Sequence, residues 1–210
     1  MLNVEIEAAG KSVPGSVHSY QDRIFLNKRK PLFLVADGVS RSSHGDGGVA
    51  AGLILNLVEA EIEKGADLST AVIKANSILV KRRFWDKDIG ETTLTGCIIV
   101  KNIAHIINIG DSPAYLLRNL SCVTMYTEDK SPEGYITQVI GQPNISVHSA
   151  AVELHPGDRI VLMSDGINNL DTGAIMRDAS IEKVVEKIIS DQKDFHGYDD
   201  DKSIIVIRVL

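Results

Sequence analysis

The sequence predicts an α+β fold, in which strands and helices occupy separate stretches of the chain. Alternating or β-branched apolar runs fill residues 4–36 and 92–163, whereas apolar residues at three- and four-residue spacing occur in 48–83 and 181–189. A last strand-like run covers residues 203–210. Because grouped strands and grouped helices are typical of α+β layers rather than of βαβ alternation, we expect a layered α+β protein.

The N-terminal stretch is predicted to contain three short strands. Residues 4–8 (VEIEA) alternate as a half-buried strand does, and residues 24–26 form a second short apolar run. Residues 32–36 (LFLVA) are apolar throughout, which is typical of a strand covered on both faces. This part of the chain is therefore expected to be β.

Two helices are predicted to follow. Apolar residues recur at helical spacing over residues 48–64, and Gly65 is suited to end the helix. The second helix is expected to begin at a cap, Asp67 or Ser69, and to run to the basic cluster 81–83, where positive charge suits the C-terminal end of the helix dipole.

The second half of the chain returns to strands. Residues 92–127 predict a meander of about four antiparallel strands, and 128–144 are polar and loop-like. Strands are expected at 145–154 and 159–163, on either side of a Pro-Gly turn. An amphipathic helix at 181–189 precedes the terminal strand.

Length and composition bound the class of protein. The 210 residues are expected to form one domain, 1–210, since 44% apolar residues, 24% charged residues and a mean hydropathy of +0.03 are ordinary for a globular chain. A net charge of -6 argues against a nucleic-acid partner. The absence of a signal-peptide pattern or a membrane-length apolar stretch predicts a soluble cytoplasmic protein without a membrane partner. Cys97 and Cys122 lie in apolar runs, which predicts reduced, buried thiols and no zinc site.

Four acidic residues share one context, the end of a strand. Asp37 and Asp165 each stand between an apolar run and a glycine, and Asp22 and Asp200 lie just before strand-like runs. Any one of them, taken alone, is most often a turn residue. If the two Asp-Gly strands are neighbours, their end carboxylates converge, and like charges held together require a cation. Oxygen ligands alone select hard ions such as magnesium or manganese.

A centre of this kind permits hydrolysis of a phosphate ester. A carboxylate that bridges two hard cations leaves open positions for water, and a bound water ionises far more readily than bulk water. The same cations neutralise the phosphoryl oxygens during attack on phosphorus. Chemistry alone therefore leads to a two-metal hydrolase.

The motifs resemble the metal-dependent protein phosphatase family (PPM, the protein phosphatase 2C type), including its bacterial and sporulation-type members. The resemblance is ordered and spans nearly the whole chain, so it is stronger than any single match. The similar segments are SYQD at 19–22, FLVADG at 33–38 with GGVAAG at 47–52, TTL at 92–94, NIGDSPAYL at 108–116, LHPGDR at 154–159 leading into MSDGI at 163–167, and DDKSI at 200–204.

The resemblance implies a site and a fold. Asp37 would be the bridging ligand, helped by the Gly38 carbonyl, and Asp22, Asp165 and Asp200 would complete a centre of two magnesium or manganese ions. The implied fold is a central antiparallel β-sandwich flanked by helix pairs, with four layers in the order α/β/β/α. The implied substrate is a phosphorylated protein, and the implied role is in signalling.

Two further acids are assigned by their position relative to the family motifs. Asp88 precedes the Thr92-Thr93 strand at a spacing similar to that of the family's third-metal carboxylate, and a plain loop acid fits this position equally well. Asp111 resembles a hairpin-turn residue rather than a ligand.

The chain departs from the family in its phosphate-binding residue. Many members have an arginine about five residues before the first acid, where this chain has Val17 and His18. Arg41 or Arg23 could substitute as the phosphate contact, because a guanidinium matches phosphate geometry. His44, in the loop after the first Asp-Gly, is a candidate general acid, with a solvated loop histidine as the alternative.

Three functions are compatible with these features. The leading hypothesis is a magnesium- or manganese-dependent serine/threonine protein phosphatase. The alternative is a catalytically weak or inactive regulatory module that binds a protein partner, because the arginine is missing and the segment between residues 127 and 145 is short. A phosphoesterase acting on a small molecule is a third reading, since fold and metal site do not fix the substrate.

Overall fold

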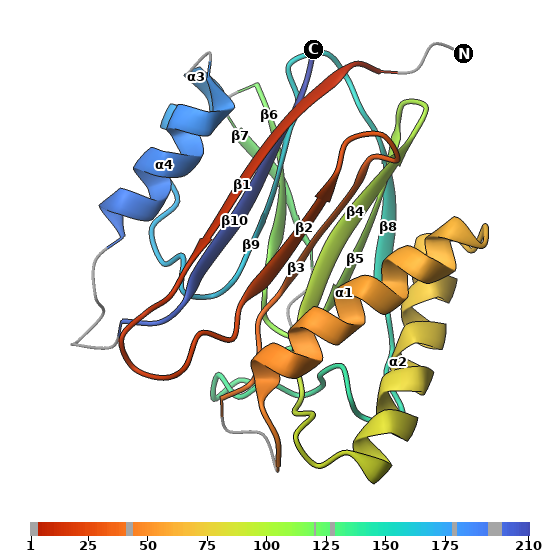
Figure 1. Ribbon diagram of the computed structural model, residues 1–210. Coiled ribbons are helices and arrows are strands. Elements are labelled where there is room, and N and C mark those ends of the chain that lie inside the picture. The colour runs from red at the N-terminus through yellow and green to blue at the C-terminus, as the bar shows by residue number, and fades with distance from the viewer. Residues whose placement is uncertain (1–3, 41–43, 120, 127–128, 178–179, 193–198) are drawn as a thin grey trace.

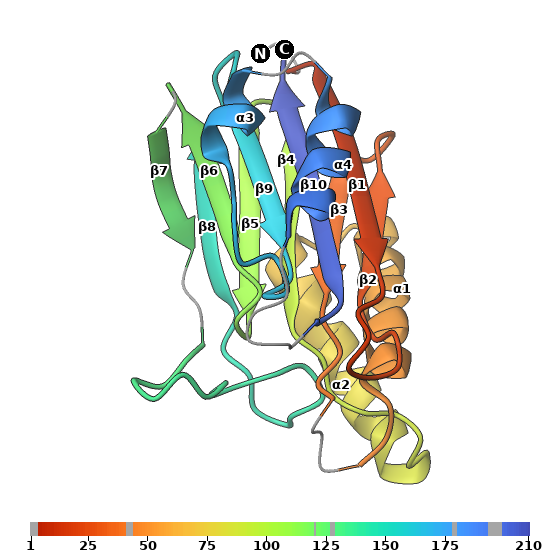
Figure 2. The same ribbon diagram turned by 90° about the vertical axis from the view of Figure 1, so that its left-hand side faces the viewer.

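The computed structural model describes residues 4–40, 44–119, 121–126, 129–177, 180–192 and 199–210. Two antiparallel sheets pack face to face, and a pair of helices covers the outer face of each sheet (Figures 1 and 2). The predicted four-layer α/β/β/α sandwich is therefore confirmed.

Each sheet contains five strands. The first has the order β2-β3-β4-β5-β8 and the second the order β1-β10-β9-β6-β7. The strands of the first sheet are β2 Arg23–Asn27, β3 Leu32–Ala36, β4 Leu94–Val100, β5 Ile103–Ile109 and β8 His148–Glu153. Those of the second are β1 Ile6–Val13, β10 Lys202–Val209, β9 Arg159–Met163, β6 Ala114–Arg118 and β7 Ser121–Tyr126.

The strand β3 shows why a fully apolar run forms here. Phe33 and Val35 point into the core between the two sheets, and Leu32, Leu34 and Ala36 point to the helices on the outer face. Successive side chains of a strand face opposite sides, so a strand covered on both sides must be apolar at every position. The sequence prediction for this strand is confirmed in both its bounds and its burial.

Helices α1 (Gly47–Glu63) and α2 (Leu68–Trp85) cover the first sheet, and α3 (Thr172–Arg177) and α4 (Ile181–Asp191) cover the second (Figure 2). Asp67, one of the two caps predicted for α2, accepts from the Thr70 amide at 3.0 Å. No helical pattern predicted the six-residue α3. In the parts of the chain that the structure describes, none of the helices combines the length and the hydropathy needed to cross a bilayer.

The predicted meander over residues 92–127 is divided between the two sheets. Strands β4 and β5 pair in one sheet and β6 and β7 in the other, because the chain crosses over at Gly110, whose φ of 93° few other residues adopt. Strands β8 and β9 are likewise consecutive but belong to different sheets. The prediction for Cys122 was wrong: Cys97 is buried, but Cys122 is exposed because β7 is an edge strand.

Candidate metal centre

A cavity of about 470 Å³ lies at the end of the sandwich where β3, β9 and β5 stop. The loop between β7 and β8 passes close to these strand ends, at the bottom of Figure 2. Three of the four predicted carboxylate ligands line the cavity, and the fourth, Asp22, is buried close enough for its charge to raise the pKa of Asp37. The described lining residues are His18, Asp37, Gly38, Val39, Ser40, Thr93, Asp111, Gly134, Ile136, Asp165 and Asp200.

Asp37 is held by its backbone. Its amide donates to Thr93 Oγ1 at 3.1 Å, and its carbonyl accepts from the Thr93 amide and from Thr92 Oγ1, each at 2.8 Å. Thr93 Oγ1 also lies 2.6 Å from Ser112 Oγ, in the turn between β5 and β6. The Thr-Thr pair therefore satisfies the backbone amide and carbonyl of Asp37, the residue that follows β3.

The chain that follows Asp37 crosses the start of α1 at very short range. A Cβ on Gly38 would lie 2.4 Å from the Gly47 carbonyl carbon, and a Cβ on Gly47 would lie 2.5 Å from the Gly38 carbonyl carbon. Neither contact can relax by rotating a side chain, because both neighbours are backbone atoms. Both position 38 and position 47 therefore require glycine, and this close crossing keeps Gly38 in the wall of the cavity.

Asp22 lies beneath the cavity with 0% of its surface exposed. Its Oδ2 accepts from Ser164 Oγ at 2.8 Å, whereas its Oδ1 is buried with no hydrogen-bond donor among the described residues. Burial raises its pKa to about 6, and the nearby Asp201 charge adds to the shift, while hydrogen bonds from Ser203 and Ser164 oppose it. A buried carboxylate oxygen without a donor is suited to a cation.

The other carboxylates also repel one another. Burial, followed by the charges of Asp22, Asp165 and Asp200, raises the pKa of Asp37 well above its usual range. Burial and the charges of Asp111 and Asp200 raise the pKa of Asp165 to about 6. Asp165 retains more contact with solvent than Asp22, so salt should screen its shift more strongly.

This donor set fits hard divalent cations, which take carboxylate and carbonyl oxygens and offset such repulsion. Among the described residues, no three His, Cys, Asp or Glu side chains already form a closed ligand cage. The carboxylates instead gather around the wall of one cavity.

The two adjacent acids of the last motif have different surroundings. Asp201, 2% exposed, accepts from the amides of Gly15 at 2.8 Å, Gln21 at 2.6 Å and Asp22 at 3.3 Å, and so fastens the N-terminal segment to the start of β10. Asp200 instead lines the cavity, where His18 Nε2 lies 2.8 Å from its Oδ1. The structure therefore separates a positioning carboxylate, Asp201, from the candidate ligand, Asp200.

We predict opposite effects for Asp201→Asn and Asp200→Asn. The first removes charge-assisted hydrogen bonds to backbone amides and should lower the free energy of unfolding by about 2–3 kcal/mol. The second should weaken manganese binding while leaving the stability of the metal-free protein unchanged or higher. Urea unfolding and calorimetric manganese titration measure the two effects, and equal destabilisation by both variants would contradict this division of roles.

His18 was noted in the sequence only as a departure from the family motif, and the structure brings it into the cavity. Its Nδ1 lies 2.9 Å from the Ser19 carbonyl and its Nε2 faces Asp200, so both ring nitrogens face oxygen acceptors. Partial burial lowers the pKa of His18, but this effect is outweighed by the Ser19 hydrogen bond and by Asp200 and Asp201, and the net shift is upward.

Of the remaining predicted residues, those that the structure describes are not among the residues that line the cavity. Asp88 is exposed in the loop between α2 and β4, and His44 lies in a bend before α1; neither is among the described residues that line the cavity. Arg41 lies outside the described residues. Arg23 donates to the Asp22 carbonyl at 2.7 Å and stacks on Tyr20, with its guanidinium carbon 4.9 Å from the ring centroid.

Asp111 is a cavity residue that the sequence did not indicate. The resemblance assigned it to a hairpin turn, but it is only 4% exposed, lines the cavity and contributes to the raised pKa of Asp165. Its turn joins β5 of one sheet to β6 of the other, so its position depends on how the two sheets pack. The Gly-Asp-Ser sequence itself was the available signal.

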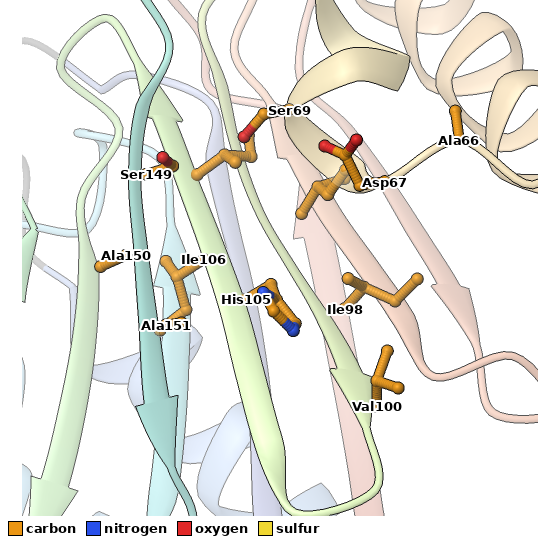
Figure 3. A pocket seen from close by; sticks show the side chains of 12 residues that line it. Ala66, Asp67, Ser69, Ile98, Val100, His105, Ile106, Ser149, Ala150 and Ala151 are labelled. Carbon is orange, nitrogen blue, oxygen red and sulfur yellow. The ribbon is translucent and has the colours of Figure 1, made fainter.

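A second hollow, of about 270 Å³, lies on the outer face of β4, β5 and β8 beside the start of α2 (Figure 3). Its wall is mostly apolar, with Ile98, Val100 and Ile106 among its side chains. Its one carboxylate, Asp67, is already engaged as the cap of α2. This hollow therefore lacks the charged groups that hydrolysis of a phosphate ester needs.

Similar proteins found by sequence are named as serine/threonine phosphatases. Serine/threonine phosphatase stp of Listeria welshimeri is 24% identical over 89% of this chain and 88% of its own length. Serine/threonine protein phosphatase PstP of Mycobacterium tuberculosis is 28% identical over 88% of this chain and 41% of its own length.

Solved structures show the same fold. The catalytic domain of PstP, solved in complex with two manganese ions, superposes with a TM-score of 0.81 at 23% identity and covers 98% of each chain. Stp1 of Staphylococcus aureus superposes with a TM-score of 0.83 at 19% identity, over 100% of this chain and 97% of that one.

The family described as Stage II sporulation protein E (SpoIIE) matches residues 32–210, from β3 to the C-terminal strand. The match includes the segments that carry Asp37, Asp165 and Asp200. The chain therefore belongs to the SpoIIE family, within the metal-dependent protein phosphatases of the PPM type.

Proposed function

We propose that this chain is a serine/threonine protein phosphatase that hydrolyses phosphoserine and phosphothreonine with two magnesium or manganese ions. The observation that carries the proposal is the gathering of Asp37, Asp165 and Asp200 around one cavity, with the charge of the buried Asp22 acting on Asp37. Relatives named as serine/threonine phosphatases, and a manganese-bound structure of the same fold, support it.

The residues would divide the work as follows. Asp37 and the Gly38 carbonyl would hold both cations, and Asp22, Asp165 and Asp200 would complete their ligands. When bound, such cations supply a water that ionises near neutral pH and neutralise the phosphoryl oxygens. Asp201 and the Thr92-Thr93 pair would act indirectly, because their hydrogen bonds to the backbone keep the ligands in place.

Other groups proposed from the sequence are not required by this arrangement. Asp88, the candidate third-metal ligand, and His44, the candidate acid, are not among the described residues of the cavity wall. His18 does line the cavity, with its Nε2 beside Asp200, and is therefore our candidate for the proton donor.

One observation favours the alternative, a phosphatase-fold module that binds a partner without turnover. The position five residues before Asp22 holds Val17, which is 43% exposed and offers no donor to a phosphate. Such a module would bind manganese through the same carboxylates but would hydrolyse nothing.

We predict manganese-dependent hydrolysis of both an aryl phosphate and a phosphothreonine peptide by the purified protein. Chelation of the metal should reduce the rate to background, and added manganese should restore it. Calorimetric manganese titration runs in parallel: metal binding without turnover on either substrate would favour the regulatory module, and turnover without metal would exclude the proposed mechanism.

A further inference from the structure

A buried ion pair joins the last turn of α2 to the segment that leads into β4. Arg83 Nη1 donates to Glu91 Oε1 at 3.1 Å, and the two side chains are only 9% and 16% exposed. Removing two charges from water is costly, and an apolar pair of similar volume often stabilises a fold at least as well. One donor, Arg83 Nη2, is also buried without an acceptor among the described residues, which adds to that cost. Stability alone therefore does not account for this pair.

The Arg83 guanidinium also holds two stretches of backbone that are far apart in the sequence. Its Nε donates to the Ile89 carbonyl at 3.2 Å, and its Nη1 donates to the Gly141 carbonyl at 2.6 Å. Gly141 has a φ of 102°, and a Cβ at this position would lie 3.2 Å from Arg83 Nη1. Glycine therefore allows the loop between β7 and β8 to approach the guanidinium this closely.

Asn76, about two turns before Arg83 on the buried face of α2, holds the same loop. It is 2% exposed; its Nδ2 donates to the Gln142 carbonyl at 2.9 Å, and its Oδ1 accepts from the Gly141 amide at 2.8 Å. The other buried residues of α2 are apolar. We call Arg83, Glu91 and Asn76 the helix clip, because they fasten two backbone segments to α2.

The helix clip fastens the outer segment of a short antiparallel ladder that ends at the cavity. Ile140 and Thr92 exchange backbone hydrogen bonds of 2.8 and 3.2 Å. Thr92 forms a second antiparallel bridge with Gly38, and its Oγ1 donates to the Asp37 carbonyl at 2.8 Å. Thr92 thus lies between the segment held by α2 and the segment that carries the predicted bridging ligand. A displacement of the outer segment would be passed through Thr92 to the cavity wall.

We propose that Arg83 is a positioning residue of the metal centre, which acts through the helix clip to fix where Asp37 and the Gly38 carbonyl stand. Glu91 links the clip to the ladder directly, since its carbonyl accepts from the Val39 amide at 2.9 Å. Arg83 is not among the described residues that line the cavity, so it would act without touching a cation or the substrate. The inference rests on the proposed function, because Asp37 and Gly38 are proposed ligands of that site.

The test measures manganese binding by isothermal titration calorimetry, at a temperature well below the melting temperature of each variant. Because removal of one partner from a buried ion pair is strongly destabilising, the main variant is the double substitution Arg83→Met/Glu91→Gln. It should fold and should raise the dissociation constant for manganese about tenfold or more, the range known for residues that support metal ligands. Arg83→Lys keeps the charge but not the planar fork, and should have an intermediate affinity.

A matched control separates positioning from a loss of stability. Leu68, 3% exposed at the other end of α2, is not part of the helix clip, and Leu68→Ala should lower the melting temperature without changing the affinity for manganese. Asn76→Ala should weaken manganese binding, as the double variant does. A double variant with wild-type affinity, or an equal loss of affinity in Leu68→Ala, would overturn the proposal.

Hydrogen exchange of the metal-free protein distinguishes this proposal from the proposed function. The amides of Thr93 and Ile140, which donate within the ladder, should exchange faster in the double variant, whereas the amide of Val161 in β9 should not change. If the wild-type protein binds no manganese, the proposed function fails, and the faster exchange would still support the role of Arg83 in positioning Asp37. Unchanged exchange in the double variant would refute that role whether or not the protein is an enzyme.

Discussion

Asp37→Asn is expected to abolish manganese binding and hydrolysis while making the metal-free protein more stable at pH 7.5. The first effect follows because Asp37 would bridge both cations, and even indirect partners of metal ligands are worth 10–100-fold, so we expect a loss of more than about a hundredfold. The second follows because burial and the charges of Asp22, Asp165 and Asp200 raise the pKa of Asp37, which shows that its ionised form is disfavoured in the fold.

The measurements for this variant are the melting temperature with and without manganese and the rate on a phosphopeptide. In the wild-type protein manganese should raise the melting temperature, since a ligand that binds only the folded state stabilises it. Asp37→Asn should show a higher melting temperature without metal and no response to manganese. Asp191→Asn, at the exposed end of α4, is the matched control. If the metal-free Asp37→Asn protein is less stable than the wild type, the prediction that the clustered carboxylates destabilise the metal-free fold is wrong.

The metal-free protein is expected to lose stability as pH rises from 4 to 7.5. Asp22 has a pKa of about 6 in the folded protein and 3.8 as its ordinary value. A raised pKa means that the folded state holds the proton more tightly, so its full stability is present below pH 3.8 and is lost as pH rises through 6. This difference in pKa corresponds to about 3 kcal/mol of stability, of which roughly half is lost between pH 5 and 7.5.

Other titrating groups either also reduce the stability of the fold as pH rises or contribute a constant amount of stability between pH 5 and 7.5. The raised pKa values of Asp165 and His18 also reduce stability as pH rises. Glu61 and Asp67 have lowered pKa values, so their contributions are complete by about pH 5.

Urea unfolding of the chelator-treated protein at pH 5 and 7.5 measures the loss, and saturating manganese should remove or reverse it. Asp22→Asn should flatten the pH dependence. A metal-free protein that is more stable at pH 7.5 than at pH 5 would show that the carboxylates are not held together in the cavity as described.

Local sequence was sufficient for most of the elements. Strand β3 was predicted to the residue, and Asp67, one of the two caps proposed for α2, is the observed cap, because a strand buried on both faces and an Asp before a helix have local causes. Strand β1 was predicted to end near residue 8 but runs to Val13, because residues 10–12, which have no apolar alternation, pair with β10. Pairing with a distant strand outweighed local pattern there.

The arrangement of the carboxylates depended on tertiary structure. The sequence reasoning required the strands before Asp37 and Asp165 to be neighbours in one sheet. They belong instead to different sheets, and their ends meet because β3 and β9 pack against each other across the sandwich. Convergence therefore arises from the face-to-face packing of two sheets, which no pattern within either strand encodes.

The sequence by itself determined which residues carry charge at strand ends, and with them the family and the class of metal. Those features are local, since an Asp-Gly after an apolar run and a Thr-Thr before one are visible in a few residues. Only the tertiary structure brought Asp111 and His18 to the cavity and divided the roles of Asp200 and Asp201. The reason is physical: the surroundings of a charge, and hence its pKa and its partners, are set by atoms that lie far away along the chain.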